Sequence, residues 1–148
     1  MIYKILYVIL PLLVFSCSSK SLDVYSKEKI YYDNGYIKAV ISKKDGKLNG
    51  ISNYYNTNSK LINSVNYLNN MLHGNWIDYY EDGSVKYKVL YNYGLKHGSE
   101  VWYYDNGNIK SEVVYDNGEI ISDKLRWDYD GNIIIKWYYT YLYILVLW

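Results

Sequence analysis

The chain has 148 residues, 16 Lys and Arg against 15 Asp and Glu, and a mean hydropathy of −0.26. This length allows one domain, and the near-neutral charge excludes the basic surface by which proteins bind nucleic acid. Tyr accounts for 22 residues and Phe for only 1. Because Tyr has an apolar ring and a polar hydroxyl, this composition favours a thin structure with half-exposed faces over a thick globule.

The N-terminal residues have the pattern of an export signal. Lys4 precedes an uncharged apolar run, Ile5–Phe15, that is shorter than the roughly 17–25 residues of a membrane-spanning helix. The run ends in Val14-Phe15-Ser16-Cys17, which resembles the lipobox of bacterial lipoproteins. The resemblance implies a lipoprotein signal peptide at residues 1–16 and a lipid on Cys17. An ordinary signal peptide, or a leader that is never cut, is the alternative.

Cys17 is the only cysteine, so neither an internal disulfide framework nor a thiolate metal site can form. We expect a durable membrane anchor there, because each buried CH₂ of an acyl chain contributes about 0.8 kcal/mol. The expected location is the cell envelope, at the outer membrane or cell surface; Ser18 after the cysteine favours the outer membrane by the same resemblance. Residues 17–29 are polar and aperiodic, which indicates a tether.

A 24-residue period follows the tether. All 10 glycines fall in three columns whose members stand 24 positions apart, and apolar columns keep the same step without insertion. A fixed period of this length is typical of repeated supersecondary units. The glycine-bearing columns are positions 35, 59, 83, 107 and 131; 50, 74, 98 and 122; and 46, 70, 94 and 118.

Each unit has the pattern of a β-hairpin. In the third unit Ile77 and Tyr79 alternate with their neighbours, and this period of two indicates strands. The turn Glu81-Asp82-Gly83-Ser84 supplies the positive φ of a tight hairpin turn. We expect the longer segment from Asn92 to Gly98 to be the loop that leads to the next hairpin. The sequence therefore predicts an all-β fold, with consecutive 24-residue β-hairpins forming one elongated, twisted antiparallel single-layer sheet.

The repeats resemble MORN repeats, most closely the short bacterial variant of that family. The family pattern is a glycine, an aromatic residue, a Tyr pair, a turn ending in Gly, an aliphatic residue, a Lys and a late Tyr. Residues 74–91 and 98–115 carry this pattern well, and the units around Tyr55 and Trp127 carry it in part. The resemblance spans residues 30–139, about 4.5 units. It implies membrane recognition or an antitoxin-like role, the two functions attached to the family.

The sequence contains no catalytic constellation: no nucleophile–base pairing, phosphate loop or metalloprotease motif stands out. Asp33, Glu81 and Asp105 repeat in the turn column, where short acids satisfy backbone N–H groups. His73 and His97 occupy equivalent loop positions, roughly 9–10 Å apart at about 4.8 Å per strand, and their column offers no strong further ligand. We therefore expect a protein that is not an enzyme and has neither a cofactor nor a metal site.

Aromatic columns form the best candidate binding surface. We expect one column, Tyr55, Tyr79, Tyr103 and Trp127, to align across the sheet beside a second column, Tyr67, Tyr91 and Tyr115. The candidate binding residues are Tyr55, Trp76, Tyr79, Trp102, Tyr103 and Trp127. The rings either only pack on one another or also bind an extended protein, glycan or lipid-headgroup partner, since exposed aromatic patches tend to mark interaction sites.

The C-terminal residues 140–148 are uncharged and hydrophobic, and they depart from the repeat. We interpret them as a capping strand, with a frame-altered tail or a membrane contact as the alternatives. For the whole chain, the sequence favours a non-enzymatic, surface-anchored repeat lipoprotein that acts as a binding or scaffold module. The alternative is an antitoxin-like protein that neutralises a partner protein through its repeat sheet.

Overall fold

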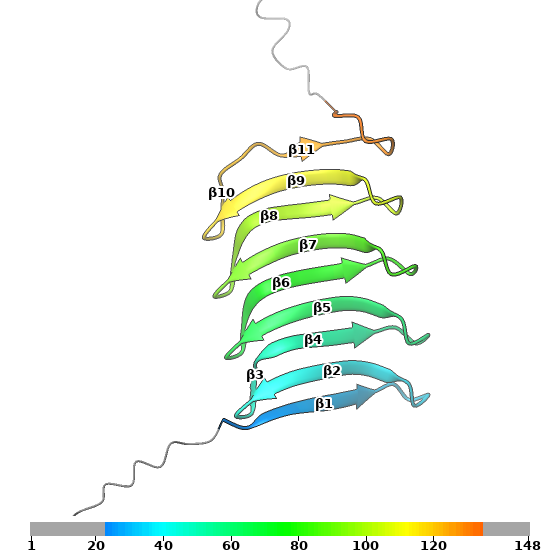
Figure 1. Ribbon diagram of the computed structural model, residues 1–148, viewed down its shortest axis with the longest axis vertical. Coiled ribbons are helices and arrows are strands. Elements are labelled where there is room, and N and C mark those ends of the chain that lie inside the picture. Colours follow the sequence, from blue (N-terminus) through cyan, green and yellow to red (C-terminus); the bar gives the residue numbers. More distant parts are fainter. Residues whose placement is uncertain (1–22, 135–148) are drawn as a thin grey trace, which may run out of the picture.

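A computed structural model describes residues 23–134 as one open, 11-stranded antiparallel sheet without a helix (Figure 1). The signal peptide, Cys17 and the tail at residues 140–148 lie outside the described residues, so the expectations for them stay predictions. The strands are β1 (Tyr25–Tyr31), β2 (Ile37–Lys44), β3 (Lys47–Leu48), β4 (Gly50–Tyr55), β5 (Leu61–Leu68), β6 (Met71–Tyr79), β7 (Val85–Asn92), β8 (Leu95–Tyr103), β9 (Ile109–Asp116), β10 (Glu119–Ile120) and β11 (Leu125–Arg126).

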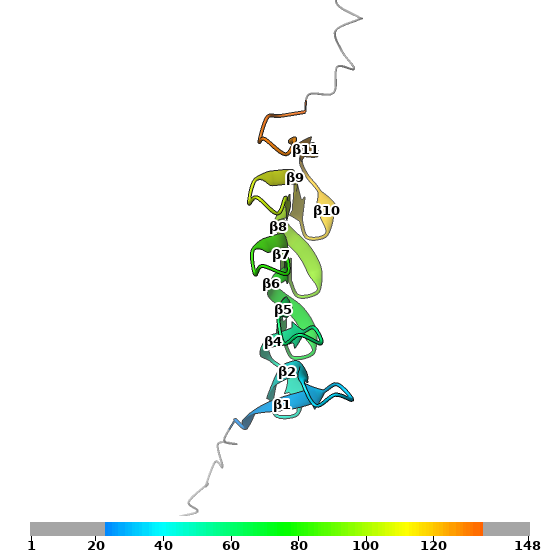
Figure 2. The ribbon, with the colours of Figure 1, turned by 90° about the vertical axis from the view of Figure 1, so that its right-hand side faces the viewer.

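The strands lie side by side in chain order, β1-β2-β4-β5-β6-β7-β8-β9-β10. Two short strands lie off this path. β3 pairs with β2 just before β4 does, and β11 pairs with β9 just after β10 does. Turned by 90°, the sheet is a single elongated layer (Figure 2). The predicted fold class is therefore confirmed. Within residues 23–134 there is no helix long and apolar enough to cross a membrane.

The sheet begins earlier than the sequence suggested. β1 starts at Tyr25, which pairs with Lys44, although residues up to 29 were expected to be tether. All residues of β1 are exposed, because it is an edge strand with a neighbour on one side only. An exposed edge strand rich in charge shows no apolar alternation, and for that reason the sequence pattern did not indicate it.

Five-residue turns connect the two strands of each predicted hairpin, and they are called here the wide turns. They are residues 32–36, 56–60, 80–84 and 104–108. In the third of them the Tyr80 N–H donates to the Ser84 carbonyl (2.9 Å) and the Gly83 N–H donates to the Tyr80 carbonyl (3.0 Å). Gly83 has a φ of 90°, a left-handed conformation that glycine adopts without strain. Just after the turn, β7 has one extra residue, Lys86, which forms a β-bulge opposite the end of β6. The hairpin turn predicted from Asp82-Gly83 is confirmed.

The narrow turns join each hairpin to the next with only two residues. Tyr93 and Gly94 have φ values of 46° and 86°, so both adopt the left-handed conformation that a two-residue type I′ turn requires. β8 starts directly afterwards, at Leu95, and continues through Gly98. The predicted loop from Asn92 to Gly98 is therefore wrong. The segment pairs with β7, and Gly98 lies at a bulge within a strand instead of in a loop.

Each of these narrow turns is hydrogen-bonded to the strand that follows the preceding narrow turn. The Gly94 N–H donates to the Leu72 carbonyl (2.7 Å), and one repeat later the Gly118 N–H donates to the Lys96 carbonyl (2.8 Å). The same contact thus recurs after 24 residues. It extends the ladder of the strands to the margin of the sheet formed by the narrow turns.

A tyrosine hydroxyl joins successive wide turns at the opposite margin. In three repeats the first turn residue donates to a backbone carbonyl of the next repeat, a contact called here the inter-repeat tyrosine bond. The pairs are Tyr32 to Tyr55 (2.7 Å), Tyr80 to Tyr103 (2.8 Å) and Tyr104 to Trp127 (3.0 Å). In each, a lysine ammonium lies over the donor ring. These lysines are Lys38, Lys86 and Lys110, at 5.6, 5.7 and 5.3 Å from the ring centroids.

Two repeats lack this tyrosine and cap their own turn instead. Oδ1 of Asn56 accepts the Lys60 N–H (3.0 Å), and Oδ1 of Asp128 accepts the Asn132 N–H (2.8 Å). The lysine is missing from the same two repeats, where Ile62 and Ile134 occupy its position. Tyrosine and lysine therefore occur together or not at all. The first turn residue therefore bonds either to the next repeat or within its own turn. In the turn at residues 56–60, the Lys60 ammonium donates to a carbonyl of the next repeat instead, that of Glu81 (2.7 Å).

The buried side chains are mostly small and lie near the middle of the strands. Val65 and Val89 are 1% and 0% exposed, and Ser52 is 0% exposed. In a single layer, only side chains with neighbours on both flanks are removed from water. Burial contributes about 25 cal/mol per Å² of apolar area, and each repeat buries little such area. Hydrogen bonds between repeats therefore supply a larger share of the stability.

Replacing Tyr80 with Phe removes the hydroxyl bond to Tyr103 and leaves the ring beneath Lys86 in place. We expect the free energy of unfolding to fall by about 1 kcal/mol, measured by urea denaturation followed by circular dichroism. Tyr93→Phe is the control, because Tyr93 is 59% exposed in a narrow turn and its hydroxyl makes no hydrogen bond within residues 23–134. An equal loss of stability in the control would contradict the role of the inter-repeat bond.

Candidate functional site

One face of the sheet, called here the aromatic face, carries two rows of side chains. Residues directly opposite each other on paired strands share a face, which defines the rows. The central row is Ser52, Val65, Trp76, Val89, Glu100 and Val113. The aromatic row, one step nearer the wide turns, is Tyr54, Asn63, Asp78, Tyr87, Trp102, Ser111 and Arg126.

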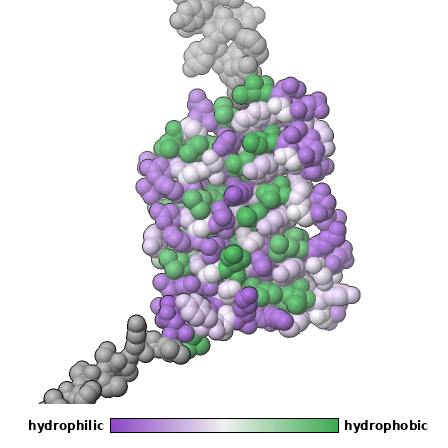
Figure 3. Space-filling view, viewed as in Figure 1, coloured by the Kyte–Doolittle hydropathy of each residue, from purple (hydrophilic) through white to green (hydrophobic). Residues whose placement is uncertain are grey.

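Both tryptophans of these rows pack against a tyrosine of the neighbouring strand. The rings of Trp102 and Tyr87 are 4.4 Å apart with an interplanar angle of 46°, and those of Trp76 and Tyr91 are 6.3 Å apart. Despite its stacking, Trp102 is 37% exposed. Hydrophobic residues are scattered over the strands in a space-filling view, and the margin of the wide turns is mostly hydrophilic (Figure 3). The packing that holds the sheet thus leaves indole surface in contact with solvent.

The aromatic columns do not lie side by side as predicted. Tyr55, Tyr79 and Tyr103 pair with Leu61, Val85 and Ile109 beside the wide turns, whereas Tyr67, Tyr91 and Tyr115 pair with Gly50, Gly74 and Gly98 at the far end of the strands. The reason is the hairpin itself, which places positions 12 residues apart at opposite ends of a strand pair.

The six candidate binding residues therefore fall into separate groups. Trp76 and Trp102 lie on the aromatic face. Tyr79 and Tyr103 directly follow members of the aromatic row, so strand alternation places them on the opposite face, and Tyr55 follows Tyr54 in the same way. The backbone carbonyls of Tyr55, Tyr103 and Trp127 accept the inter-repeat tyrosine bonds.

A buried carboxylate lies in the central row on the same strand as Trp102, and the sequence pattern gave no sign of it. Glu100, in the central row, is 8% exposed. Its Oε1 accepts the Tyr87 hydroxyl (2.6 Å) and the Lys96 ammonium (2.5 Å), and its Oε2 accepts the Tyr115 hydroxyl (3.1 Å). The Lys96 ammonium also lies 4.9 Å from the centroid of the Tyr115 ring. The carboxylate is thus satisfied by three donors.

The surroundings of Glu100 keep it ionised. Burial raises the pKa of Glu100, but the hydrogen bonds from Lys96 and Tyr87 outweigh burial and leave the pKa below its ordinary value of 4.5. Burial and the hydrogen bond to Glu100 both raise the pKa of the Tyr87 hydroxyl. Toward the narrow turns, burial and a hydrogen bond with Tyr54 raise the pKa of Tyr67 to about 12. At neutral pH the group therefore contains the Glu100 carboxylate, the Lys96 ammonium and the neutral phenol of Tyr87.

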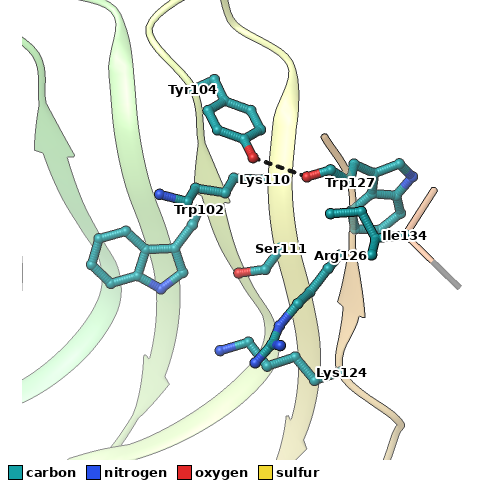
Figure 4. Close-up of a pocket in the computed structure, with 8 residues that line it drawn as sticks. All are labelled: Trp102, Tyr104, Lys110, Ser111, Lys124, Arg126, Trp127 and Ile134. Atoms are coloured by element: carbon teal, nitrogen blue, oxygen red, sulfur yellow. Dashed lines mark hydrogen bonds between the residues drawn. The ribbon is translucent and has the colours of Figure 1, made fainter. Parts of the chain in front are cut away.

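A hollow of about 390 Å³ lies at the last repeat, within the range of small-molecule sites, about 300–1,000 Å³. We call it the Ser111 hollow, because Ser111 lies between Trp102 and Arg126 in the aromatic row. Trp102 and Trp127 stand on opposite sides of it, with Lys110 and Ser111 between them (Figure 4). The remaining lining residues are Tyr104, Lys124 and Ile134.

The two histidines lie in strands β6 and β8, not in loops as predicted, because the narrow turns contain only two residues. Nδ1 of His73 accepts the Tyr93 N–H (3.4 Å), and the two rings are 4.7 Å apart. Nδ1 of His97 lies 3.2 Å from the Asp116 carboxylate. In residues 23–134 no group of three or more His, Cys, Asp or Glu side chains could hold a metal ion.

Replacing Glu100 with Gln removes the charge from its two tyrosines and Lys96. We expect a loss of about 2 kcal/mol in the free energy of unfolding at pH 7, measured by urea denaturation. Because the folded-state pKa lies below 4.5, the stabilisation is complete above that value and is lost as pH falls through the folded pKa. The difference between the two proteins should therefore shrink below pH 4.5.

Glu112→Gln is the matched control, since Glu112 is half-buried on the opposite face of β9 and forms no ion pair within residues 23–134. It should leave stability nearly unchanged. A loss in Glu100→Gln that stays constant between pH 3 and pH 7 would contradict the assignment of an ionised, hydrogen-bonded carboxylate.

Comparison with protein families gives one match. Residues 72–93 and 96–117 match the family model described as MORN repeat variant, and these segments correspond to hairpins β6–β7 and β8–β9. No curated protein matches the chain. The chain therefore carries MORN-variant repeats over residues 72–117, which confirms that part of the predicted resemblance.

Proposed function

We propose that this protein is a non-enzymatic, surface-anchored repeat lipoprotein whose sheet is a binding or scaffold module. The observation that carries the proposal is the aromatic face. In a single-layer sheet no second layer covers it within residues 23–134, and Trp102 keeps 37% of its surface exposed although its ring packs against Tyr87. Exposed aromatic side chains of this kind are enriched at binding surfaces, and the partner class is a protein, a glycan or a lipid headgroup.

The Glu100 group supports a structural role over an acid–base one. A general acid at neutral pH needs a raised carboxyl pKa, whereas hydrogen bonds hold the pKa of Glu100 below its ordinary value. Three donors already occupy the carboxylate. The group therefore rigidifies the face on which Trp76 and Trp102 lie.

The position of β1 supports an anchored module. β1 begins at Tyr25, soon after Cys17 in the sequence, and it is the first strand of the sheet. Strands are spaced about 4.8 Å apart, so the path from β1 to β10 extends over roughly 40 Å. An anchor at Cys17 would hold the β1 end nearest the membrane and leave the aromatic face of the later repeats accessible.

A test places a photoreactive benzoylphenylalanine at Trp76, or at Lys88 as the matched control, in cells fed labelled palmitate. Lys88 is exposed on the opposite face of the neighbouring strand. We expect palmitate on the wild-type chain, and cross-links to envelope molecules from position 76 but not from position 88. Cys17→Ala should abolish both the label and the cross-links.

An unlabelled chain that keeps its leader would contradict the anchored role. If that chain cross-linked instead to one cytoplasmic protein, the antitoxin-like alternative would be favoured. Equal cross-linking from positions 76 and 88 would contradict the assignment of the aromatic face as the binding surface.

A further inference from the structure

We propose that the Ser111 hollow binds an acidic saccharide, with a sugar ring against the Trp102 indole and its carboxylate on the cations. The inference deepens the proposed function by giving the aromatic face a ligand class. It rests on the shape of the hollow, on its charge and on the exposed indole at its side.

The shape follows from one small residue. In the aromatic row, Ser111 is flanked by Trp102 on β8 and Arg126 on β11. One repeat earlier the equivalent position is Tyr87, whose ring packs against the Trp102 indole at 4.4 Å, and the repeats before it have Ala39 and Asn63. The small side chain of Ser111 therefore leaves open part of the hollow of about 390 Å³. A serine between a tryptophan and an arginine occurs in this row only at Ser111 within residues 23–134, so the hollow is specific to this part of the sheet.

The charge of the hollow is positive. Lys110, Lys124 and Arg126 line it, and no lining residue is acidic. Among residues 23–134 the ion pairs involve other cations, such as Lys96 with Glu100, so these three have no carboxylate partner there. The Arg126 guanidinium offers a planar fork that binds a carboxylate through two parallel hydrogen bonds. An anion is thus the complementary ligand.

The exposed indole favours a ring over a simple anion. Trp102 stands at one side of the hollow (Figure 4), and the apolar C–H face of a pyranose packs well against an indole. Trp127 directly follows Arg126, so strand alternation turns its side chain to the opposite face. A phosphate ion or an acidic peptide would use the cations without the Trp102 indole, and a neutral sugar would use the indole without the cations. A sugar ring that carries a carboxylate uses both sets of side chains, and a partly exposed tryptophan such as Trp102 gains from the contact.

Isothermal titration calorimetry of the full chain in detergent micelles tests the inference, with hexagalacturonate as the probe. Maltohexaose supplies the neutral saccharide and hexaglutamate supplies the charge without the ring. We expect hexagalacturonate to bind at least tenfold more tightly than either control. Its binding should also quench tryptophan fluorescence. Equal affinity for hexaglutamate would overturn the inference, since the hollow would then recognise charge alone.

Two variants connect the binding to the hollow. Ser111→Tyr places in the hollow the side chain that the preceding repeat has at this position. Arg126→Gln removes the guanidinium, and Arg126 is exposed, so the fold should tolerate the change. Each variant should weaken hexagalacturonate binding at least tenfold. Lys88→Gln, on the opposite face, should bind as the wild type does. Arg126→Gln keeps the test decisive if Ser111→Tyr fails to fold, which its urea midpoint reveals. Unchanged binding in Arg126→Gln would overturn the inference.

The outcomes separate this inference from the proposed function. If hexagalacturonate fails to bind while position 76 still forms envelope cross-links, the saccharide site is wrong and the anchored binding module stands. If both fail, the proposed function fails as well.

Discussion

Hydrogen bonds between neighbouring repeats hold this molecule together at both margins as well as along the strands. At one margin the Gly94 N–H reaches Leu72 of the preceding repeat, and at the other the Tyr80 hydroxyl reaches Tyr103 of the following one. A sheet one layer thick has no opposing surface on which to bury apolar side chains. Its stability therefore depends on neighbours within the layer, and each repeat contacts only the repeats beside it. The 24-residue period follows from this constraint, because each bond between repeats needs its donor and acceptor at a fixed separation in the sequence.

Because the sheet is one layer thick, both of its faces contact solvent within residues 23–134. A single residue that differs between repeats therefore changes the shape of the exposed surface. In a thick core, Ser111 in place of a tyrosine would create a cavity with a cost in stability. In this sheet it leaves an open hollow between Trp102 and Arg126. The column of Glu100 also varies, with Glu28, Ser52 and Trp76 in the preceding repeats. The charge of Glu100 is offset by Lys96 and two tyrosine hydroxyls, so variable positions of the aromatic face lie next to its packed rings.

Periodic features could be predicted from the sequence, and local departures could not. The hairpins, the wide turns and the single sheet follow from columns that repeat across four units. The narrow turn was missed in the third repeat, where Tyr93 takes the place of Asp or Asn at a positive φ of 46°, although Asp45-Gly46 and Asn117-Gly118 carry the residues that a type I′ turn favours. The two aromatic columns were wrongly predicted to lie side by side. The period gives the spacing of residues along the chain, but it does not show at which end of a strand each column lies. Glu100 and Ser111 stand in columns whose residues differ from repeat to repeat, so their roles depend on contacts across strands that no spacing reveals.

The central claim is that bonds between repeats, including the inter-repeat tyrosine bonds, hold the sheet together. Hydrogen exchange of the wild-type chain, followed residue by residue, tests it most directly, because local opening reports local stability. At the junction of β5 with β6, Asn56 replaces the bonding tyrosine and only the exposed Lys60 ammonium reaches a carbonyl of the next wide turn, whereas the junction of β7 with β8 has the Tyr80 bond. We expect faster exchange at Asn63 and Asp78 than at the equivalent Tyr87 and Trp102. Equal or reversed protection of the two junctions would contradict it.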